Sequence, residues 1–231
     1  MKTINKTLSS LIILSSLLLQ SANGQAGHHQ VNIEFTCISL DASIRKEKLY
    51  YLKNNRPINI RVNNLFHSPV YKYSGLNTLS FYTKGENGKH LLKGKANIDQ
   101  NLKNACVFFY QESSENNSPK YKTIAFENSA EKYPAGSYRF YNLTKETVAI
   151  KIGEESIIAA PEKLVEFIQN SDYDSTVHLS VSIKKQDSNK PLYSNEWPQK
   201  ASSRSLVLIS KAGAKQSGKI KVKVFNDRIL P

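Results

Sequence analysis

The stretch Tyr133-Pro-Ala-Gly-Ser-Tyr-Arg-Phe-Tyr-Asn-Leu-Thr144 decides the fold of this 231-residue chain. Its first half, which contains Pro134 and Gly136, has the composition of a turn. Its second half, residues 137–143, alternates like a strand with one buried face. Because similar strands and turns occur before and after this stretch, the sequence predicts that residues 134–136 join two similar β-domains.

Residues 1–26 have the layout of a secretory signal peptide. Two lysines precede an apolar run over residues 8–19, and small residues follow at Ala22, Gly24 and Ala26. The apolar run is shorter than the roughly 20 residues that span a bilayer, and no later segment is more apolar. We therefore expect an exported chain, secreted or periplasmic, without a transmembrane segment after cleavage.

Strand signals dominate from residue 31 to the carboxyl end. Residues 31–37 and 177–183 alternate apolar and polar side chains. Residues 106–110 are continuously apolar, which is typical of a strand buried on both faces. Residues 162–169 fit a short helix or a strand equally well. No sustained helical periodicity occurs elsewhere, so the sequence predicts an all-β protein.

An internal repeat supports two copies of one domain. Three segments recur in order, with residues 33–38, 106–110 and 126–128 matching residues 138–143, 205–209 and 225–227. The last two matches share an offset of 99 residues, so the polar loop between them keeps its length. We therefore predict two tandem immunoglobulin-like antiparallel β-sandwiches, over residues 27–132 and residues 133–231.

The only two cysteines, Cys37 and Cys106, are candidates for a disulfide. Both lie in predicted strands of the first domain, and an exported chain meets an oxidising compartment. The repeat places Asn142 and Ser205 at the corresponding positions, so the second copy lacks both cysteines together. Such a bridge would stabilise the fold by roughly 4 kcal/mol in the chain-entropy model. Two buried free thiols are the alternative.

The chain is strongly basic, with a formal net charge of +13 at pH 7. In an exported protein, the anions that this charge attracts are acidic polysaccharide and lipid head groups. We expect no nucleic-acid partner, because the lysines of residues 219–224 alternate with apolar residues, as on the solvent face of an edge strand. A basic surface without a dedicated ligand is the alternative.

Aromatic residues near lysines are the candidate ligand contacts. Tyr71, Tyr73 and Tyr82 lie in a turn-rich segment, and Tyr193 and Trp197 lie in a loop-like run. Aromatic faces suit stacking on sugar rings, while neighbouring lysines suit acidic sugars. The alternative is that these rings close the ends of each sandwich.

The sequence contains no recognised catalytic or metal-binding motif. The histidines lack metal-ligand spacing, no serine lies in a Gly-x-Ser-x-Gly elbow, and no glycine-rich phosphate loop occurs. We therefore predict no catalytic residues, no metal, no cofactor and no enzymatic activity. The weaker candidates for a pair of hydrolase carboxylates are Glu154, Glu155, Glu162 and Glu166.

Cleavage after Ala26 would create a candidate metal site at the new amino terminus. The new terminus would read Gly27-His28-His29. Its amine, two backbone amides and an imidazole would form a square-planar nitrogen site, which Cu(II) and Ni(II) favour. Cleavage after Gly24 would remove this possibility.

The second half resembles a class of exported bacterial β-domains. Residues 135–153, Ala159-Ala-Pro161 and Arg204-Ser-Leu-Val-Leu-Ile209 carry its short motifs: a Gly-Ser-x-Arg-x-x-Asn strand, a Val-x-x-x-x-Gly strand and an Ala-Pro turn. The periplasmic accessory proteins of alginate O-acetylation are similar in style. The resemblance implies tandem immunoglobulin-like sandwiches without catalytic residues.

Together these features favour a non-enzymatic, exported binding or accessory protein of the cell envelope or extracellular space. Its expected partner is an anionic polysaccharide or an envelope protein. A carbohydrate-active or other hydrolase on the same scaffold is one alternative. A structural surface component, in which the sandwiches serve as spacers, is the other.

Overall fold

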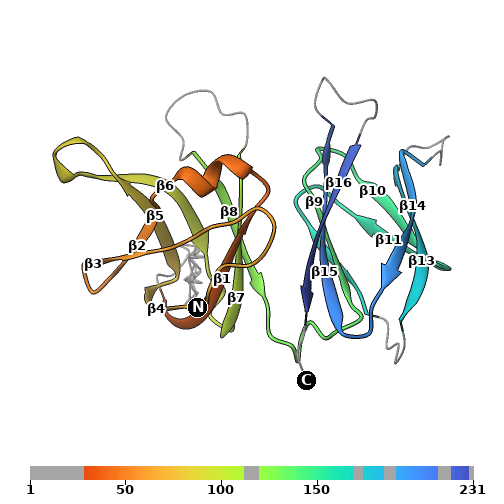
Figure 1. The fold of residues 1–231 in the computed structure, drawn as a ribbon, viewed down its shortest axis with the longest axis horizontal. Helices are drawn as coiled ribbons and strands as arrows, with labels where there is room; N and C mark the ends of the chain where they lie inside the picture. Colours follow the sequence, from red (N-terminus) through yellow and green to blue (C-terminus); the bar gives the residue numbers. More distant parts are fainter. Residues whose placement is uncertain (1–28, 112–119, 169–173, 185–190, 213–219, 229–231) are drawn as a thin grey trace, which may run out of the picture.

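The computed structural model describes residues 29–111, 120–168, 174–184, 191–212 and 220–228, and almost all of its regular elements are strands. Figure 1 shows two β-sandwiches side by side, joined by one connection at their lower ends. The predicted all-β sandwich architecture is therefore confirmed. The expected signal peptide lies outside the described residues. Within the described ranges, no helix is long and apolar enough to cross a membrane.

The first sandwich contains eight strands and two short 3-10 helices. They are β1 (Gln30–Ser39), η1 (Ala42–Lys46), β2 (Tyr50–Lys53), β3 (Arg56–Asn59), β4 (Tyr71–Leu76), β5 (Thr78–Lys84), η2 (Glu86–Gly88), β6 (His90–Asn97), β7 (Asn104–Tyr110) and β8 (Lys122–Glu127). The second sandwich contains β9 (Tyr138–Asn142), β10 (Val148–Ile152), β11 (Glu155–Ala159), β12 (Leu164–Phe167), β13 (Ser175–Ile183), β14 (Tyr193–Gln199), β15 (Ser203–Lys211) and β16 (Ile220–Arg228).

The two sandwiches have the same strand order. The sheets of the first read β4-β1-β7-β8 and β3-β2-β5-β6, and those of the second read β12-β9-β15-β16 and β11-β10-β13-β14. In each sandwich one central pair is parallel, β1 with β7 and β9 with β15. Constant immunoglobulin domains order their sheets A-B-E-D and C-F-G, so this chain shares their architecture but not their strand order. The topology shows that the second half repeats the first.

Strand pairing corrects the register of the repeat. Phe126 pairs with Cys106, and Phe225 pairs with Leu206. With Phe126 matched to Phe225 as predicted, Cys106 corresponds to Leu206 rather than to Ser205. The parallel partners of these two residues, Thr36 and Arg139, then match Cys37 to Phe140 rather than to Asn142. A shift of one residue matters because it exchanges the two faces of a strand. One residue has been lost between the two strands of the second copy, which an ungapped comparison could not detect.

Each sandwich encloses its own core between its two sheets. The predicted inward face of the first strand is correct, since Val31, Ile33, Phe35 and Cys37 all belong to the first core. The second core contains apolar residues of the same relative positions on β9, β10, β13 and β15, including Phe140, Ile150, Val181 and Val207. Either half thus buries the apolar face of both its sheets.

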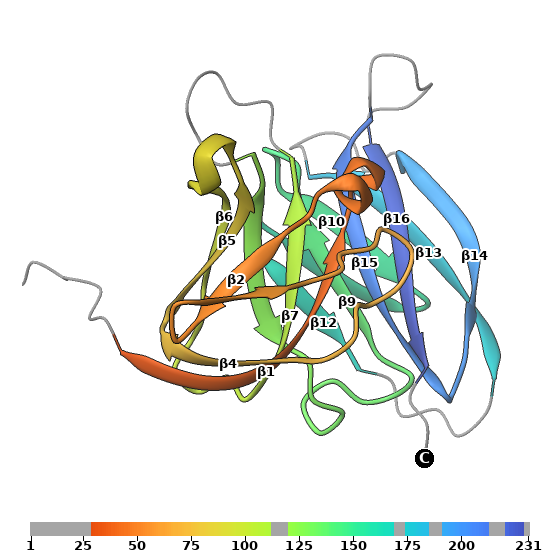
Figure 2. The same ribbon diagram turned by 60° about the vertical axis from the view of Figure 1, so that its left-hand side comes forward.

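A third apolar cluster lies between the sandwiches, where the sheets that contain β7 and β15 face each other (Figures 1 and 2). Its buried members are Ile38, Cys106, Phe108, Tyr110, Tyr141, Leu206, Leu208 and Phe225. We call these residues the junction cluster. Lys223 of β16 adds a hydrogen bond across the junction, in which its Nζ donates to the Leu40 carbonyl at 3.2 Å. β7 and β15 are consequently buried on both faces, as their apolar runs predict.

The segment between β8 and β9 contains the predicted domain boundary at residues 132 and 133. The ring of Tyr133 lies between two buried guanidinium groups, with ring-centre distances of 4.0 Å to Arg139 and 4.7 Å to Arg204. Arg204 Nη1 also donates to the Tyr133 carbonyl at 2.8 Å. Gly136 adopts φ +79°, a left-handed conformation that glycine accepts without strain. Two arginines of the second sandwich therefore hold the segment between β8 and β9 in place.

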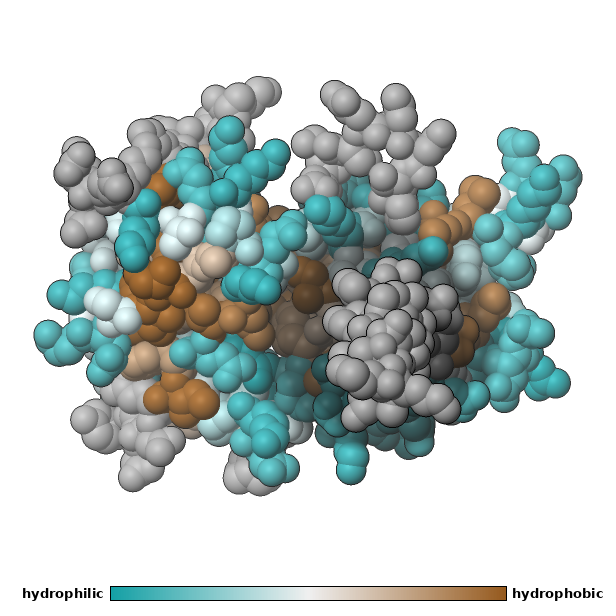
Figure 3. Space-filling view, turned by 180° about the vertical axis from the view of Figure 1, so that it is seen from behind, coloured by the Kyte–Doolittle hydropathy of each residue, from teal (hydrophilic) through white to brown (hydrophobic). Residues whose placement is uncertain are grey.

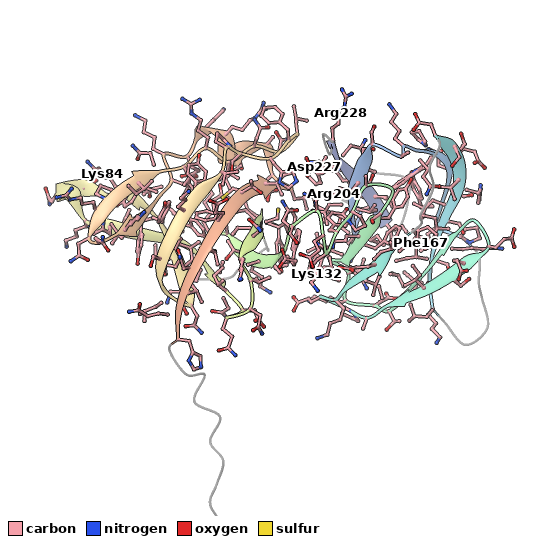
Figure 4. All side chains as sticks on the ribbon, turned by 90° about the horizontal axis from the view of Figure 1, so that it is seen from below. Lys84, Lys132, Phe167, Arg204, Asp227 and Arg228 are labelled. Atoms are coloured by element: carbon pink, nitrogen blue, oxygen red, sulfur yellow. The ribbon has the colours of Figure 1, made fainter. Side chains whose placement is uncertain are left out.

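Both arginines are neutralised by carboxylates of their own sandwich. Arg204 donates from Nε and Nη2 to Asp227 Oδ2, at 3.0 and 2.8 Å. Arg139 Nε lies 2.7 Å from Glu166 Oε1. Figure 4 shows Arg204 and Asp227 beside the connection between the sandwiches. Because buried charges require such partners, this pairing is what allows the arginines to lie at the junction.

The predicted disulfide is wrong, because Cys37 and Cys106 are both free and buried. In the parallel pair of β1 and β7, Cys37 lies opposite Val107, whereas Cys106 lies opposite Thr36. Successive side chains of a strand point to opposite faces. Cys37 consequently enters the first core and Cys106 enters the junction cluster. Thiols on opposite faces of one sheet do not meet the geometry of a disulfide.

Candidate ligand-binding face

Two of the predicted ligand contacts, Tyr73 and Trp197, are core residues, each only 7 % exposed. Tyr73 donates its hydroxyl hydrogen to the Leu76 carbonyl at 2.8 Å. Trp197 Nε1 donates to the Tyr193 hydroxyl at 2.8 Å. A ring that is covered in this way offers no face to a sugar, so these two predictions are wrong.

Tyr71 and Tyr193 are half-buried and also serve the cores. Tyr71 packs against Phe35 with ring centres 5.6 Å apart, and its hydroxyl accepts from the Arg61 amide at 2.8 Å. Tyr193 packs against the second core and holds Trp197 through the bond described above. These rings close the sandwiches, which was the alternative interpretation of their sequence pattern.

Tyr82 is as exposed as Tyr71 and Tyr193, but it is the one predicted contact that packs against none of the apolar clusters of the described residues. On β5 its neighbours Phe81 and Thr83 point into the first sandwich and are buried, so Tyr82 points outward and is partly exposed. It lies opposite Tyr50 on β2 and Leu92 on β6. The sheet β3-β2-β5-β6 thus presents Tyr82 at the centre of its outer surface.

Tyr50 and His90 support the Tyr82 ring from both neighbouring strands. The rings of Tyr50 and Tyr82 are stacked, with centres 6.0 Å apart, and the His90 ring lies 5.8 Å from Tyr82. The Tyr50 hydroxyl and His90 Nδ1 are 2.6 Å apart. Burial and then the neighbouring Tyr82 raise the pKa of Tyr50, so its hydroxyl stays protonated. Tyr82 is therefore held by contacts that a ligand need not supply.

Lysines flank this aromatic group. Lys84 lies opposite His90 at the end of β5, and Lys95 of β6 lies opposite Ser80, one pair along the same face from Tyr82. Both lysines are exposed, and neither forms an ion pair with any described residue. In Figure 4, Lys84 projects from the end of the first sandwich farthest from the junction. We call Tyr50, Tyr82, His90, Lys84 and Lys95 the Tyr82 face.

Both sandwiches expose large apolar side chains, and those of the second form a patch on one face. Figure 3 shows apolar side chains gathered on the rear of the second sandwich. Among the described residues of this half, the exposed large apolar side chains are Ile158, at 46 %, and Ile168, at 52 %. Such surface gives an anion no charge to bind. The Tyr82 face lies apart from it, on the outer sheet of the first sandwich.

A polar contact at the junction, between half-buried His67 and buried Cys106, was not predicted from the sequence. His67 Nδ1 lies 3.0 Å from Thr36 Oγ1 and 3.8 Å from Cys106 Sγ. Burial lowers the pKa of His67 and raises the pKa of Cys106 to about 12. Both groups are thus held neutral, and a protonated thiol is a poor nucleophile. His67 and Cys106 are far apart in sequence, so no spacing could have paired them.

Ser194, His178 and Glu196 form a second unpredicted group, on the outer surface of β13 and β14. His178 Nδ1 lies 2.7 Å from Glu196 Oε1, and His178 Nε2 lies 3.0 Å from Ser194 Oγ. This order matches a Ser-His-carboxylate relay. Acyl transfer also requires donors above the serine for the oxyanion, and the amides of a strand lie in the plane of its sheet. The three residues are best described as a cross-strand surface contact.

The remaining chemical candidates are dispersed. Glu166 pairs with Arg139 and Glu162 pairs with Lys122, at 2.7 and 3.4 Å, so they do not form an acid pair with one another. Among the described residues, no cluster of histidine, cysteine and carboxylate side chains could hold a metal ion. The proposed copper-binding terminus begins at residues 27 and 28, which lie outside the described residues.

No protein-family model matches the chain, and no curated protein matches it either.

Proposed function

We propose that this chain is a non-enzymatic, exported binding or accessory protein of the cell envelope or extracellular space, and that it binds anionic polysaccharide on the Tyr82 face. The observation that carries the proposal is the position of Tyr82. Its ring is partly exposed at the centre of an outer sheet, supported by Tyr50 and His90 and flanked by Lys84 and Lys95, which form no ion pair with any described residue.

The chemistry of this face suits an acidic sugar. The C–H face of a pyranose ring packs on an aromatic ring, while its carboxylate is attracted to ammonium groups beside that ring. Lys84 and Lys95 lose no ion pair when an anion arrives, because none exists in the described residues. The overall positive charge, +13 for the full sequence, favours the encounter with a polyanion.

The expected affinity for one sugar unit is low. Each exposed lysine contributes at most about 1 kcal/mol, and this contribution falls with salt. A long polymer offers many equivalent units, so its apparent affinity rises through repeated contacts. We therefore expect binding to the polymer at low ionic strength that weakens steeply between about 10 and 300 mM salt.

The test compares the mature chain with two variants on polygalacturonate and on neutral dextran, by affinity electrophoresis. Tyr82→Ala removes the ring, and the double variant Lys84→Gln/Lys95→Gln removes the charges. We expect each to weaken polygalacturonate binding about tenfold at 10 mM salt, which corresponds to about 1.4 kcal/mol. The matched control, Lys145→Gln/Lys163→Gln, changes the same net charge through two exposed lysines of the second sandwich.

Two results would overturn the proposal. One is the absence of polygalacturonate binding at every salt concentration down to about 10 mM, where screening is weak. The other is an equal loss of binding in the control and the Lys84/Lys95 variant, since that would mean that net charge rather than the Tyr82 face holds the polymer. Circular dichroism of each variant excludes loss of folding as the cause.

A further inference from the structure

A polar cavity lies at the open lower mouth of the second sandwich, between its two sheets. Its volume is about 400 Å³, which is within the usual range of small-molecule sites. The residues that give it its chemistry are Asp174, Lys200, Ser202, Ser203, Asn226 and Arg228. We call this cavity the Arg228 basin.

Strand register explains how these polar side chains come together. Val222 and Val224 of β16 pack against the second core, so Asn226 and Arg228 continue the same face beyond the core's edge. Arg228 lies opposite Ser203 on β15. The facing sheet supplies Lys200, just after β14 ends, and Asp174, just before β13 begins. The basin therefore forms where the cores stop and the two sheets remain apart.

The basin is rich in hydrogen-bond donors. Lys200 and Arg228 are exposed and form no ion pair with any described residue. Asn226 Oδ1 already accepts from Ser205 Oγ at 2.9 Å, which leaves the two amide hydrogens of Asn226 for a ligand. The hydroxyl groups of Ser202 and Ser203 add further donors at the wall.

Of the two carboxylates near the basin, Asp227 is neutralised by Arg204, whereas Asp174 keeps its charge. Asp174 Oδ1 accepts from the Ala201 amide at 3.0 Å, which fixes the turn beside Lys200. Asp227 lies on the opposite face of β16 and is paired with Arg204 at the junction. In Figure 4, Arg228 points into solvent, away from the Arg204–Asp227 pair. Arg228 is thus free to bind an anion from outside the chain.

We propose that the Arg228 basin binds one uronic acid unit of the polysaccharide, with Arg228 and Lys200 on the carboxylate and Asn226 and Ser202 on the sugar hydroxyls. A guanidinium matches a carboxylate with two parallel hydrogen bonds, which selects it over a neutral substituent. This inference rests on the proposed function and gives that function a second contact, on the other sandwich. A polymer that reaches both sites would bind more tightly than either site alone.

The test uses trigalacturonic acid with the full mature chain, because this oligomer fits one site and excludes the gain from a polymer. Its Kd is measured by isothermal titration at about 20 mM salt, and the amide resonances that shift are mapped by NMR. We expect the amide resonances of Ser202, Ser203 and Asn226 to shift when trigalacturonic acid binds. In the double variant Lys200→Gln/Arg228→Gln, the Kd for the basin should rise about tenfold. Asp174→Asn, which keeps Oδ1 as acceptor but removes a repelling charge, should bind about twofold more tightly.

The controls separate the two proposals. Lys221→Gln removes an exposed lysine at the other end of β16 and should change Kd less than twofold. Neutral maltotriose should shift no basin resonance. If trigalacturonic acid shifts only the Tyr82 face and the Lys200/Arg228 variant binds as well as the parent, the basin inference is overturned while the proposed function stands. If neither site responds to the oligomer or the polymer, the proposed function fails and the inference with it.

Discussion

Phe108→Ala tests whether the two sandwiches are held together by the junction cluster. The Phe108 side chain is fully buried although it points away from the core of its own sandwich. Its ring is stacked on Tyr110 with centres 5.6 Å apart, and the Tyr141 ring of the second sandwich approaches edge-on at 6.5 Å. An isolated first sandwich would expose this ring, so its burial depends on the neighbouring sandwich.

The expected loss follows from that burial. Removing a buried phenylalanine ring costs about 3–5 kcal/mol, which is a large part of the 5–15 kcal/mol that stabilises a typical fold. For a chain of this size the fall in Tm is roughly 6–20 °C. Phe109→Ala should cost a similar amount, because Phe109 is equally buried in the first core. Phe66→Ala should cost less than about 0.5 kcal/mol, since that side chain is 60 % exposed.

Urea unfolding followed by two signals distinguishes the junction from the core. Trp197, the only tryptophan, lies in the second core, so its fluorescence reports the second sandwich, while far-ultraviolet circular dichroism reports both. Phe108→Ala should lower the midpoint of the Trp197 signal, because the second sandwich loses its neighbour. Phe109→Ala should chiefly lower the circular dichroism midpoint. A Phe108→Ala loss below about 1 kcal/mol, close to the Phe66→Ala control, would refute the packing of the sandwiches through this face.

Three further expectations follow from buried groups. Non-reduced, denatured protein should react with two equivalents of a thiol label, at Cys37 and Cys106. A protein mass lower by two hydrogens, together with no labelling, would instead show that the two cysteines form a disulfide. Because burial lowers the pKa of His67, the unfolded chain, with its ordinary value of about 6.5, binds more protons there as the pH falls. Stability should therefore decrease below about pH 6.5 until the folded pKa is passed, and urea midpoints at pH 7.5 and 5.5 should differ less in His67→Gln. Trp197 fluorescence should resist acrylamide quenching, whereas strong quenching would place the ring at the surface.

The alternation of side chains was sufficient to predict the class of fold. The alternation at residues 31–37 predicts a half-buried strand, and these residues belong to β1. The continuous apolar run at residues 106–110 predicts a strand buried on both faces, and it belongs to β7. Residues 162–169 fitted helix or strand, and the structure forms β12 (Leu164–Phe167) within them. Four apolar residues without helical partners could not settle this locally, whereas pairing with β9 does.

The candidate site shows where local patterns stop being informative. Tyr73, Tyr82 and Trp197 occur in similar surroundings in the sequence, yet only Tyr82 faces solvent. Alternation places a ring on one of two faces but does not say which face a second sheet covers. The support of Tyr82 by Tyr50 and His90 likewise depends on strand pairing across the first half of the chain.

The sequence by itself determined most of the strands, the turn at Tyr133–Gly136 and the existence of two copies, because side-chain alternation and turn composition are local properties. It was wrong about the turn-rich segment at Tyr71 and the loop-like run at Tyr193, which are β4 and β14. Only the tertiary structure decided how the copies align, where the two thiols point and what covers the outer face of β7. A shift of one residue in the second copy leaves the local pattern almost unchanged, yet it places Leu206 rather than Ser205 opposite Phe225 and in the junction. Which surface lies buried depends on contacts between distant strands, and these contacts exist only once both sandwiches have formed.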